Sequence, residues 1–260
     1  MRFRFLTVVA MLGTVQLFGQ QLDRILVPIH LRGQVVEGAY GSRWTSELRI
    51  FNSGTTEAFI DNLGPTCTVP CPTAIPPAKV MDGTFVIVLM SNPGPGVFLR
   101  VEPTYAGQLV FQARVRDLSR ESDRWGAWLP VVRESEATTD VMHLLSIPIE
   151  PGYRQTLRVY SFDGRPGQQA RVQVFLTDPK GASADELVNE FVLSLARGSF
   201  SQPAYAEAVE LTAPAVGREV RVTITPEGLP FPLWGMVSLT NNVTQEVTMI
   251  VPNSPSAASE

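Results

Sequence analysis

At 260 residues the chain exceeds the length at which one hydrophobic core keeps growing, so we expect two domains of ordinary size. Its net charge of −4 is spread along the sequence without a basic stretch, which argues against nucleic acid or an anionic membrane surface as a partner. A composition with 20 Gly and 21 Pro favours many short strands over long helices.

Residues 1–19 have the pattern of a secretion signal. Two arginines precede a largely apolar run, Phe5–Phe18, and Gly19 offers a small residue before a cleavage point. The run is short for a membrane span, and no cysteine follows it to carry a lipid anchor. We therefore expect an exported protein, periplasmic or extracellular, with no membrane span in the mature chain. A retained N-terminal anchor helix is the alternative.

Residues 20–135 are expected to form a first antiparallel β-sandwich. Its opening strand, Leu22–Leu31, contains Pro28, which favours an edge position because proline cannot donate to a strand ladder. The stretch Thr84–Met90 is apolar on both faces and predicts a central, covered strand. The other predicted strands are Trp44–Asn52, Ala58–Asp61, Val97–Val101, Leu109–Val115 and Trp125–Val132.

One segment of this unit, W-T-S-E-L-R-I-F-N at Trp44–Asn52, returns at Tyr153–Ser161 as Y-R-Q-T-L-R-V-Y-S, a shift of 109 positions (153 − 44). Both copies alternate as a strand buried on one face does. The expected inner residues are Trp44, Leu48 and Ile50 or Tyr153, Leu157 and Val159, and the outer ones are Thr45, Glu47 and Arg49 or Arg154, Thr156 and Arg158. Phe51 and Tyr160 interrupt the polar row at the same place. The chain is therefore predicted to be a tandem repeat.

Residues 141–252 are expected to form the second sandwich, after a short polar linker over Glu134–Asp140. Within it, Asp185–Ala196 fits a short helix or a strand, and its alternating apolar residues favour the strand. Residues 253–260 are predicted to be a disordered tail. The other predicted strands are His143–Ile149, Tyr153–Ser161, Gln169–Thr177, Ala204–Leu211, Arg218–Ile224, Trp234–Thr240 and Gln245–Val251, the last two joined as a hairpin. This pattern predicts an all-β fold of two tandem antiparallel sandwiches.

Several segments carry a resemblance to a known kind of module. They are G-S-R-W-T-S-E-L-R-I-F-N-S-G, V-F-L-R-V-E, F-Q-A-R-V-R-D, W-G-A-W-L-P-V-V and the closing W-G-M-V-S-L-T-N-N-V-T-Q-E-V-T-M-I-V-P. Together they resemble the immunoglobulin-like modules repeated in secreted bacterial proteins. The resemblance implies two tandem immunoglobulin-like sandwiches that serve as spacers or binding modules. It transfers no catalytic residue to this sequence.

The two cysteines, Cys67 and Cys71, lie in a proline-rich loop, G-P-T-C-T-V-P-C-P. In an exported protein this pattern favours a small disulfide, with two free thiols as the alternative. A zinc site would need two more ligands, and the only histidines, His30 and His143, are far away in sequence. The spacing also differs from that of a redox C-x-x-C pair.

The sequence marks out no reaction chemistry. It contains neither a G-x-S-x-G nor an H-E-x-x-H motif, and both histidines lie in apolar first strands. A hydrolytic carboxylate pair stays open among 25 acidic residues, although their neighbours distinguish none of them. The acidic clusters at Asp117–Asp123 and Asp178–Glu186 lack the regular alternation of a calcium loop and are interpreted as solvated turns. We expect no enzyme activity, no catalytic residue, no cofactor and no metal.

Exposed aromatic side chains offer a sharper hypothesis, because flat rings stack on sugars. The candidate ligand contacts are Trp125, Trp128 and Trp234, with Tyr105 and Tyr205 as further candidates. Trp125 and Trp128 are three positions apart, so they share a face only if a bulge at Gly126 aligns them. The alternative is that each tryptophan packs in or beside a core.

Three functional hypotheses follow. The first is a non-catalytic exported structural, adhesive or protein-binding module whose partner is a protein or glycan at the cell surface. The second is a carbohydrate-binding β-sandwich. The third is a periplasmic fibre-assembly chaperone that lends the strand Leu109–Val115 to its client, although small Ala113 and the lack of a basic anchor pair depart from that pattern.

Overall fold

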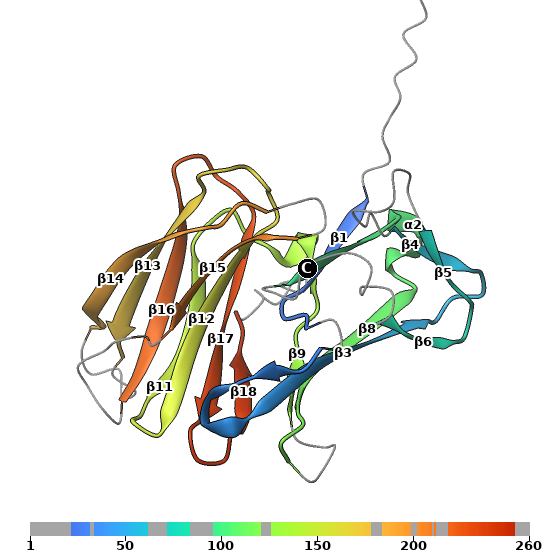
Figure 1. Ribbon diagram of the computed structural model, residues 1–260. Helices are drawn as coiled ribbons and strands as arrows, with labels where there is room; N and C mark the ends of the chain where they lie inside the picture. The colour runs from blue at the N-terminus through green and yellow to red at the C-terminus, as the bar shows by residue number, and fades with distance from the viewer. Residues whose placement is uncertain are drawn as a thin grey trace, which may run out of the picture.

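The computed structural model describes residues 22–31, 34–61, 72–83, 96–120, 126–177, 184–198, 202–209, 211 and 218–252. Strands in four antiparallel sheets dominate these residues, which confirms the prediction of an all-β sandwich fold (Figure 1). Several predictions lie outside the described residues: the signal at 1–19, the cysteines Cys67 and Cys71, the strand at 84–90, Trp125, and the tail at 253–260.

The first half of the chain contains ten strands among the described residues. One sheet has the order β10-β1-β7-β4-β5, and the other has the order β2-β3-β8-β9, with β6 also paired to β3. Its elements are β1 (Asp23–Val27), β2 (Val36–Glu37), η1 (Ala39–Gly41), β3 (Arg43–Asn52), β4 (Ala58–Asp61), β5 (Pro72–Ile75), β6 (Val80–Asp82), β7 (Val97–Val101), α2 (Pro103–Ala106), β8 (Leu109–Asp117), β9 (Gly126–Leu129) and β10 (Val132–Arg133).

The second half follows a single turn of 3-10 helix and also forms two sheets. Their orders are β11-β16-β13-β14 and β15-β12-β17-β18. The elements are η2 (Glu134–Glu136), β11 (Met142–Ile149), β12 (Tyr153–Ser161), β13 (Gln169–Leu176), β14 (Glu186–Ser194), β15 (Ala204–Val209), β16 (Arg218–Glu227), β17 (Leu233–Asn241) and β18 (Val247–Ile250). The ambiguous segment near Asp185 is therefore a strand, and β17 and β18 form the predicted hairpin.

The strand order of the second half repeats that of the first. The series β1-β7-β4-β5 corresponds to β11-β16-β13-β14, and β6-β3-β8-β9 corresponds to β15-β12-β17-β18. In this correspondence β3 is equivalent to β12. The shift of 109 positions in the sequence indicates the same equivalence. In each half the two sheets pack face to face around a cluster of buried apolar side chains.

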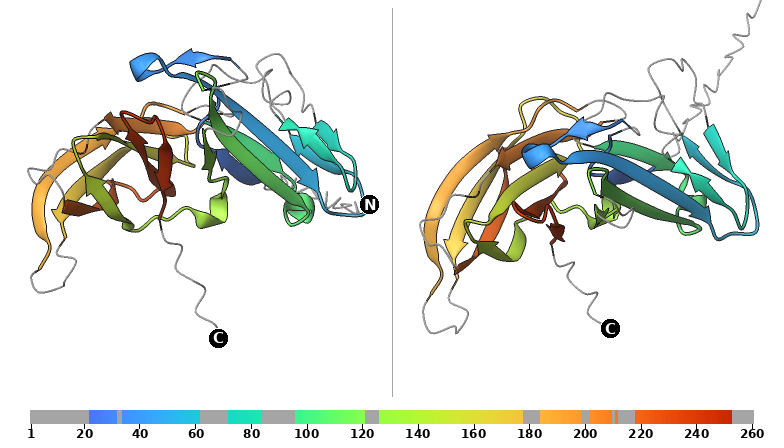
Figure 2. Two further views of the ribbon diagram at one scale, coloured as in Figure 1. Left: turned by 90° about the horizontal axis from the view of Figure 1, so that it is seen from below. Right: turned by 60° about the horizontal axis from the view of Figure 1, so that its bottom comes forward.

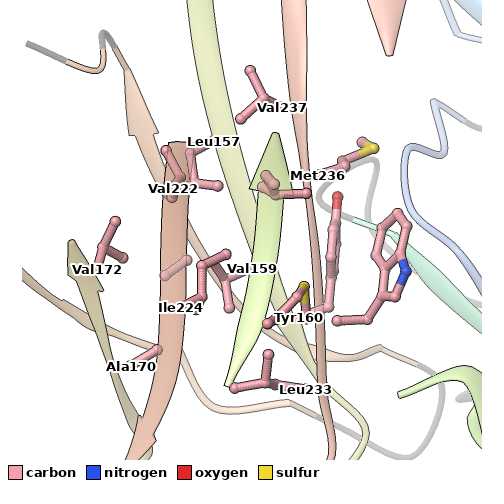
Figure 3. Packing of buried hydrophobic residues seen from close by; sticks show 14 of the residues in the cluster. Leu157, Val159, Tyr160, Ala170, Val172, Val222, Ile224, Leu233, Met236 and Val237 are labelled. Atoms are coloured by element: carbon pink, nitrogen blue, oxygen red, sulfur yellow. The ribbon is translucent and has the colours of Figure 1, made fainter. Parts of the chain in front are cut away.

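The alternation predicted for β3 and β12 is confirmed in the middle of each strand. Thr45, expected on the outer face, is however 9% exposed, and Trp44 and Tyr153, expected inside, are half-buried. Leu48 and Ile50 are fully buried between the sheets of the first half, and Leu157 and Val159 are buried in the second. Figure 3 shows Leu157 and Val159 directed toward Val222 and Ile224 of β16, while Tyr160 projects from the opposite side of its strand. Burial of a single face fixes the register of such strands, since a slip by one residue would expose every inner side chain.

The edge position predicted from Pro28 is wrong. Strand β1 pairs with β10 on one side and β7 on the other. It ends at Val27, before the proline, so the missing N–H removes no bond from the ladder. In the second half, Pro148 lies within strand β11, and β11 is an edge strand of its sheet.

The two halves lie side by side (Figure 2). They share a buried junction. Leu26, Phe98 and Val132 of the first half join the hydrophobic cluster of the second. They lie against the outer side of the sheet containing β12, where Tyr160 is fully buried. The Tyr160 hydroxyl donates a hydrogen bond of 2.5 Å to the backbone carbonyl of Pro28.

Arg24 adds polar contacts to the same junction. Its guanidinium donates to the backbone carbonyl of Phe162, and its Nε donates to Glu134 Oε2 at 2.7 Å. The Phe98 and Phe162 rings have centroids 5.1 Å apart, and the guanidinium carbon lies 5.7 Å from the centroid of Phe98. The junction thus combines apolar packing with satisfied polar groups, which favours one fixed arrangement of the halves.

Replacing Tyr160 by Phe should destabilise the protein by about 1–3 kcal/mol, because the Pro28 carbonyl would stay buried without its donor. Urea denaturation at neutral pH measures the change in the free energy of unfolding. The matched control is Tyr40→Phe, at a tyrosine 74% exposed to solvent, which should change stability by less than about 0.5 kcal/mol. Equal effects of the two substitutions would contradict the described junction.

The buried tyrosine should also make stability depend on alkaline pH. Burial raises the pKa of Tyr160 well above its ordinary value of about 10. The unfolded chain therefore loses this proton first, so the contribution of Tyr160 is complete below pH 10 and declines as pH rises further. Between about pH 9 and 11 we expect the free energy of unfolding to fall less steeply in Tyr160→Phe than in the wild type; parallel pH profiles would refute this.

Candidate ligand-binding face

The structure separates the aromatic side chains that the sequence offered as ligand contacts. Trp128 is 61% exposed, whereas Trp234 is 5% exposed and has its ring centroid 6.1 Å from that of Tyr160. Tyr105 is half-buried against Phe59, and the half-buried Tyr205 donates to Glu207. Among the described candidates, Trp128 is thus the one whose ring is mostly open to solvent.

Trp128 belongs to a group of side chains on the outward side of β3, β8 and β9. The strand register pairs Glu47 with Arg114, Arg49 with Gln112, and Arg114 with Trp128. Residues paired across neighbouring antiparallel strands project on the same side, so these five side chains lie next to one another. They line a hollow of about 220 Å³. We call this surface the open face.

Glu47 organises the open face. Its Oε2 accepts a hydrogen bond of 2.8 Å from Arg114 Nε, and its Oε1 accepts another from Arg116. The guanidinium carbon of Arg114 lies 5.6 Å from the centroid of the Trp128 ring, within the range of a cation–π contact. One carboxylate therefore positions the arginine that stacks on the exposed ring. At the side of the hollow, Arg49 pairs with Asp82 at 3.7 Å.

Glu47 stays ionised at neutral pH. Partial burial acts to raise its pKa, but hydrogen bonds from Arg114 and Arg116 and their positive charges outweigh this effect and lower it. The carboxylate is thus an acceptor with a fixed orientation. Such a group suits the placement of a polar ligand better than the transfer of a proton near neutral pH.

A second hollow, of about 840 Å³, lies at the junction of the halves. It is bordered by the linker, by β11 and by the end of the chain after β18, and Trp234 contributes to its wall. The apolar side chains Val141, Leu145 and Val251 lie at its rim. His143 also lines it, with Nδ1 3.4 Å from Thr223 Oγ1.

The interpretation of Asp117 as part of a solvated turn is wrong. This carboxylate is 3% exposed and ends β8. Its Oδ1 accepts hydrogen bonds from the backbone N–H and the hydroxyl of Ser119, at 2.9 and 2.6 Å, and Arg120 lies against the other oxygen. Asp117 therefore closes the turn after β8. Within the described residues, no three histidines, cysteines or acidic residues lie close enough to hold a metal ion.

Sequence reasoning placed Glu47 and Arg49 on the polar face of their strand but did not connect them with Trp128. The alternation of each strand was visible, whereas the register between β3, β8 and β9 was not. A search for a tryptophan in the predicted strand that follows a row of alternating polar residues would have suggested this group of side chains.

The structure defines an antiparallel β-sandwich protein with an exposed tryptophan held in a charged sheet face. No protein-family model, curated protein or solved structure matches the chain. In the part of the chain that is described, no helix is both long and apolar enough to cross a membrane.

Replacing Glu47 by Gln should remove two ion pairs and destabilise the protein by about 0.5–1.5 kcal/mol at pH 7. Because the folded-state pKa of Glu47 is lowered, its contribution is present above the unfolded value of about 4.3 and is lost as pH falls through the folded pKa. Wild type and variant should thus converge in urea denaturation between pH 5 and 2. In the exposed control Glu57→Gln, the free energy of unfolding should stay close to that of the wild type at every pH. A difference in this free energy between Glu47→Gln and the wild type that persists at pH 2 would contradict this account.

Proposed function

We propose that the chain is a non-catalytic exported protein in which two copies of an immunoglobulin-like module act together as an adhesive or spacer unit. The repeated strand order supports the two copies. The apolar run with flanking arginines at residues 1–19 supports export.

Strand pairing supports the immunoglobulin-like assignment. An immunoglobulin constant domain pairs strands B and E in one sheet and C, F and G in the other. In the first half, β1 and β7 pair as strands B and E do. Strands β3, β8 and β9 pair in the order of strands C, F and G. The strands β11, β12, β16, β17 and β18 follow it in the second half.

The observation that carries the adhesive or spacer role is the buried junction. Apolar packing around Leu26 and Phe98, together with the Tyr160 hydrogen bond, fixes one half against the other. A pair of modules held in this way presents its outer faces at a constant spacing and orientation. Partner binding then loses little conformational entropy.

Four groups with shifted pKa values are poorly suited to general acid–base catalysis near neutral pH. A general acid or base works best with a pKa near the operating pH. Here the pKa values of Glu47 and Asp117 are lowered, and those of Tyr160 and Tyr205 are raised, in each case away from neutrality. These shifts arise from burial, hydrogen bonds and neighbouring charges that stabilise the fold.

The fibre-assembly chaperone receives less support. The strand expected to serve a client, Leu109–Val115, lies within β8. Strand β8 is paired with β3 on one side and β9 on the other. A strand with both edges occupied has no ladder groups to offer to another chain.

The proposal is tested by export and adhesion in one system. The full chain, expressed in cells of its native host, should appear outside the cytoplasm, and a variant with Arg2 and Arg4 changed to Glu should be retained. Beads coated with the exported protein should adhere to the envelope of the same cells without added cofactor. The control beads carry the same protein after heat denaturation. Cytoplasmic retention of the wild type, or equal adhesion of both bead types, would contradict the proposal.

A further inference from the structure

The open face has a buried counterpart in the second half. The register gives the equivalences: Phe51 with Tyr160, Val110 with Trp234, Gln112 with Met236, Arg114 with Ser238, and Trp128 with Met249. In the second half, Tyr160, Trp234 and Met236 are buried at the junction, and Met249 packs against both clusters. The same side of the module is therefore an internal contact in one half and an external surface in the other.

The two surfaces differ in chemistry as well as in exposure. The buried counterpart has apolar Met236 where the open face has Gln112, and small Ser238 where it has Arg114. The open face nevertheless keeps a large aromatic ring at the position of Met249. A single exposed apolar side chain is ordinary on a protein surface, so the ring alone indicates no ligand. The combination of one exposed tryptophan and surrounding charges instead indicates a ligand with both apolar and hydroxyl surfaces.

Trp128 is presented to such a ligand in a fixed orientation. Arg114 lies over the ring and is itself held by Glu47, which is also bonded to Arg116. With the guanidinium against the ring and 61% of the residue exposed, aromatic surface is left for a ligand. A ring held by two successive contacts needs little ordering when a ligand binds.

We propose that the open face binds one neutral pyranose unit of a glycan, whose C–H face stacks on Trp128 and whose hydroxyls hydrogen-bond to Gln112, Arg49 and Glu47. This inference rests on the adhesive role proposed above and names the ligand class of that site. The side-chain amide supplies a donor and an acceptor, the guanidinium supplies donors, and the carboxylate supplies an acceptor. Sugar hydroxyls accept and donate in turn.

Size and charge agree with a single neutral ring. The hollow of about 220 Å³ is smaller than the pockets of about 300–1,000 Å³ that enclose drug-sized ligands. Its two arginines are already engaged by carboxylates, Arg114 by Glu47 and Arg49 by Asp82. Hydroxyl groups can join these pairs without displacing them, whereas a sugar carboxylate would compete with Glu47 and Asp82.

The first test is a glycan array probed with the folded protein, followed by titration calorimetry with the best neutral oligosaccharide and with its uronic acid analogue. Trp128→Ala should weaken binding at least tenfold. Gln112→Ala, which keeps the ring, should weaken it several-fold. Tyr40→Ala removes an exposed aromatic elsewhere and should leave the affinity unchanged. Urea denaturation of each variant checks that it is folded.

Three results would overturn the inference. In the first, the wild type binds no glycan at millimolar ligand. In the second, folded Trp128→Ala keeps the wild-type affinity. In the third, the uronic acid binds more tightly than its neutral analogue. The bead assay separates this inference from the proposed function. Adhesion that is abolished by protease treatment of the cells but survives periodate oxidation of their glycans would indicate a protein partner, and it would overturn the sugar site while the adhesive role stands.

Discussion

The arrangement of this molecule depends on the covering of one sheet face by the other half of the chain. On the outer side of the sheet that contains β12, Tyr160 and Trp234 are buried because the first half packs against them, with Tyr160 bonded to the Pro28 carbonyl. Burial of that aromatic surface favours association, and the hydroxyl bond selects one orientation, since any other would leave two polar groups buried without partners. The relative position of the halves follows from this contact.

The two halves share one strand order, but the equivalent sheet face is buried in one half and exposed in the other. In the second half, the outer side of the β12 sheet carries the buried side chains Tyr160, Trp234 and Met236 and forms the junction. In the first half, the equivalent side carries ion pairs around Trp128. The junction therefore decides which of the two equivalent faces stays exposed. It also holds that face at a constant distance from the loops of the second half, as an adhesive or spacer protein requires.

Local patterns in the sequence predicted much of the fold. Alternation identified β3 and β12 almost to the residue, and turn residues marked the hairpin of β17 and β18. Non-local pairing was out of reach: nothing near Pro28 shows that β10 pairs with β1 from more than a hundred residues away. For the same reason the sequence offered Trp128 and Trp234 as equals. Only the packing of the halves buries one and exposes the other.

Residual dipolar couplings of backbone amides, measured on the purified protein in a dilute aligning medium, test the junction most directly. The account predicts that a single alignment tensor fits the amides of β3 and of β12 equally well, because the halves form one rigid body. Two tensors of different magnitude or orientation would show that the halves reorient independently, and would contradict both the buried Tyr160 contact and the fixed presentation of the open face.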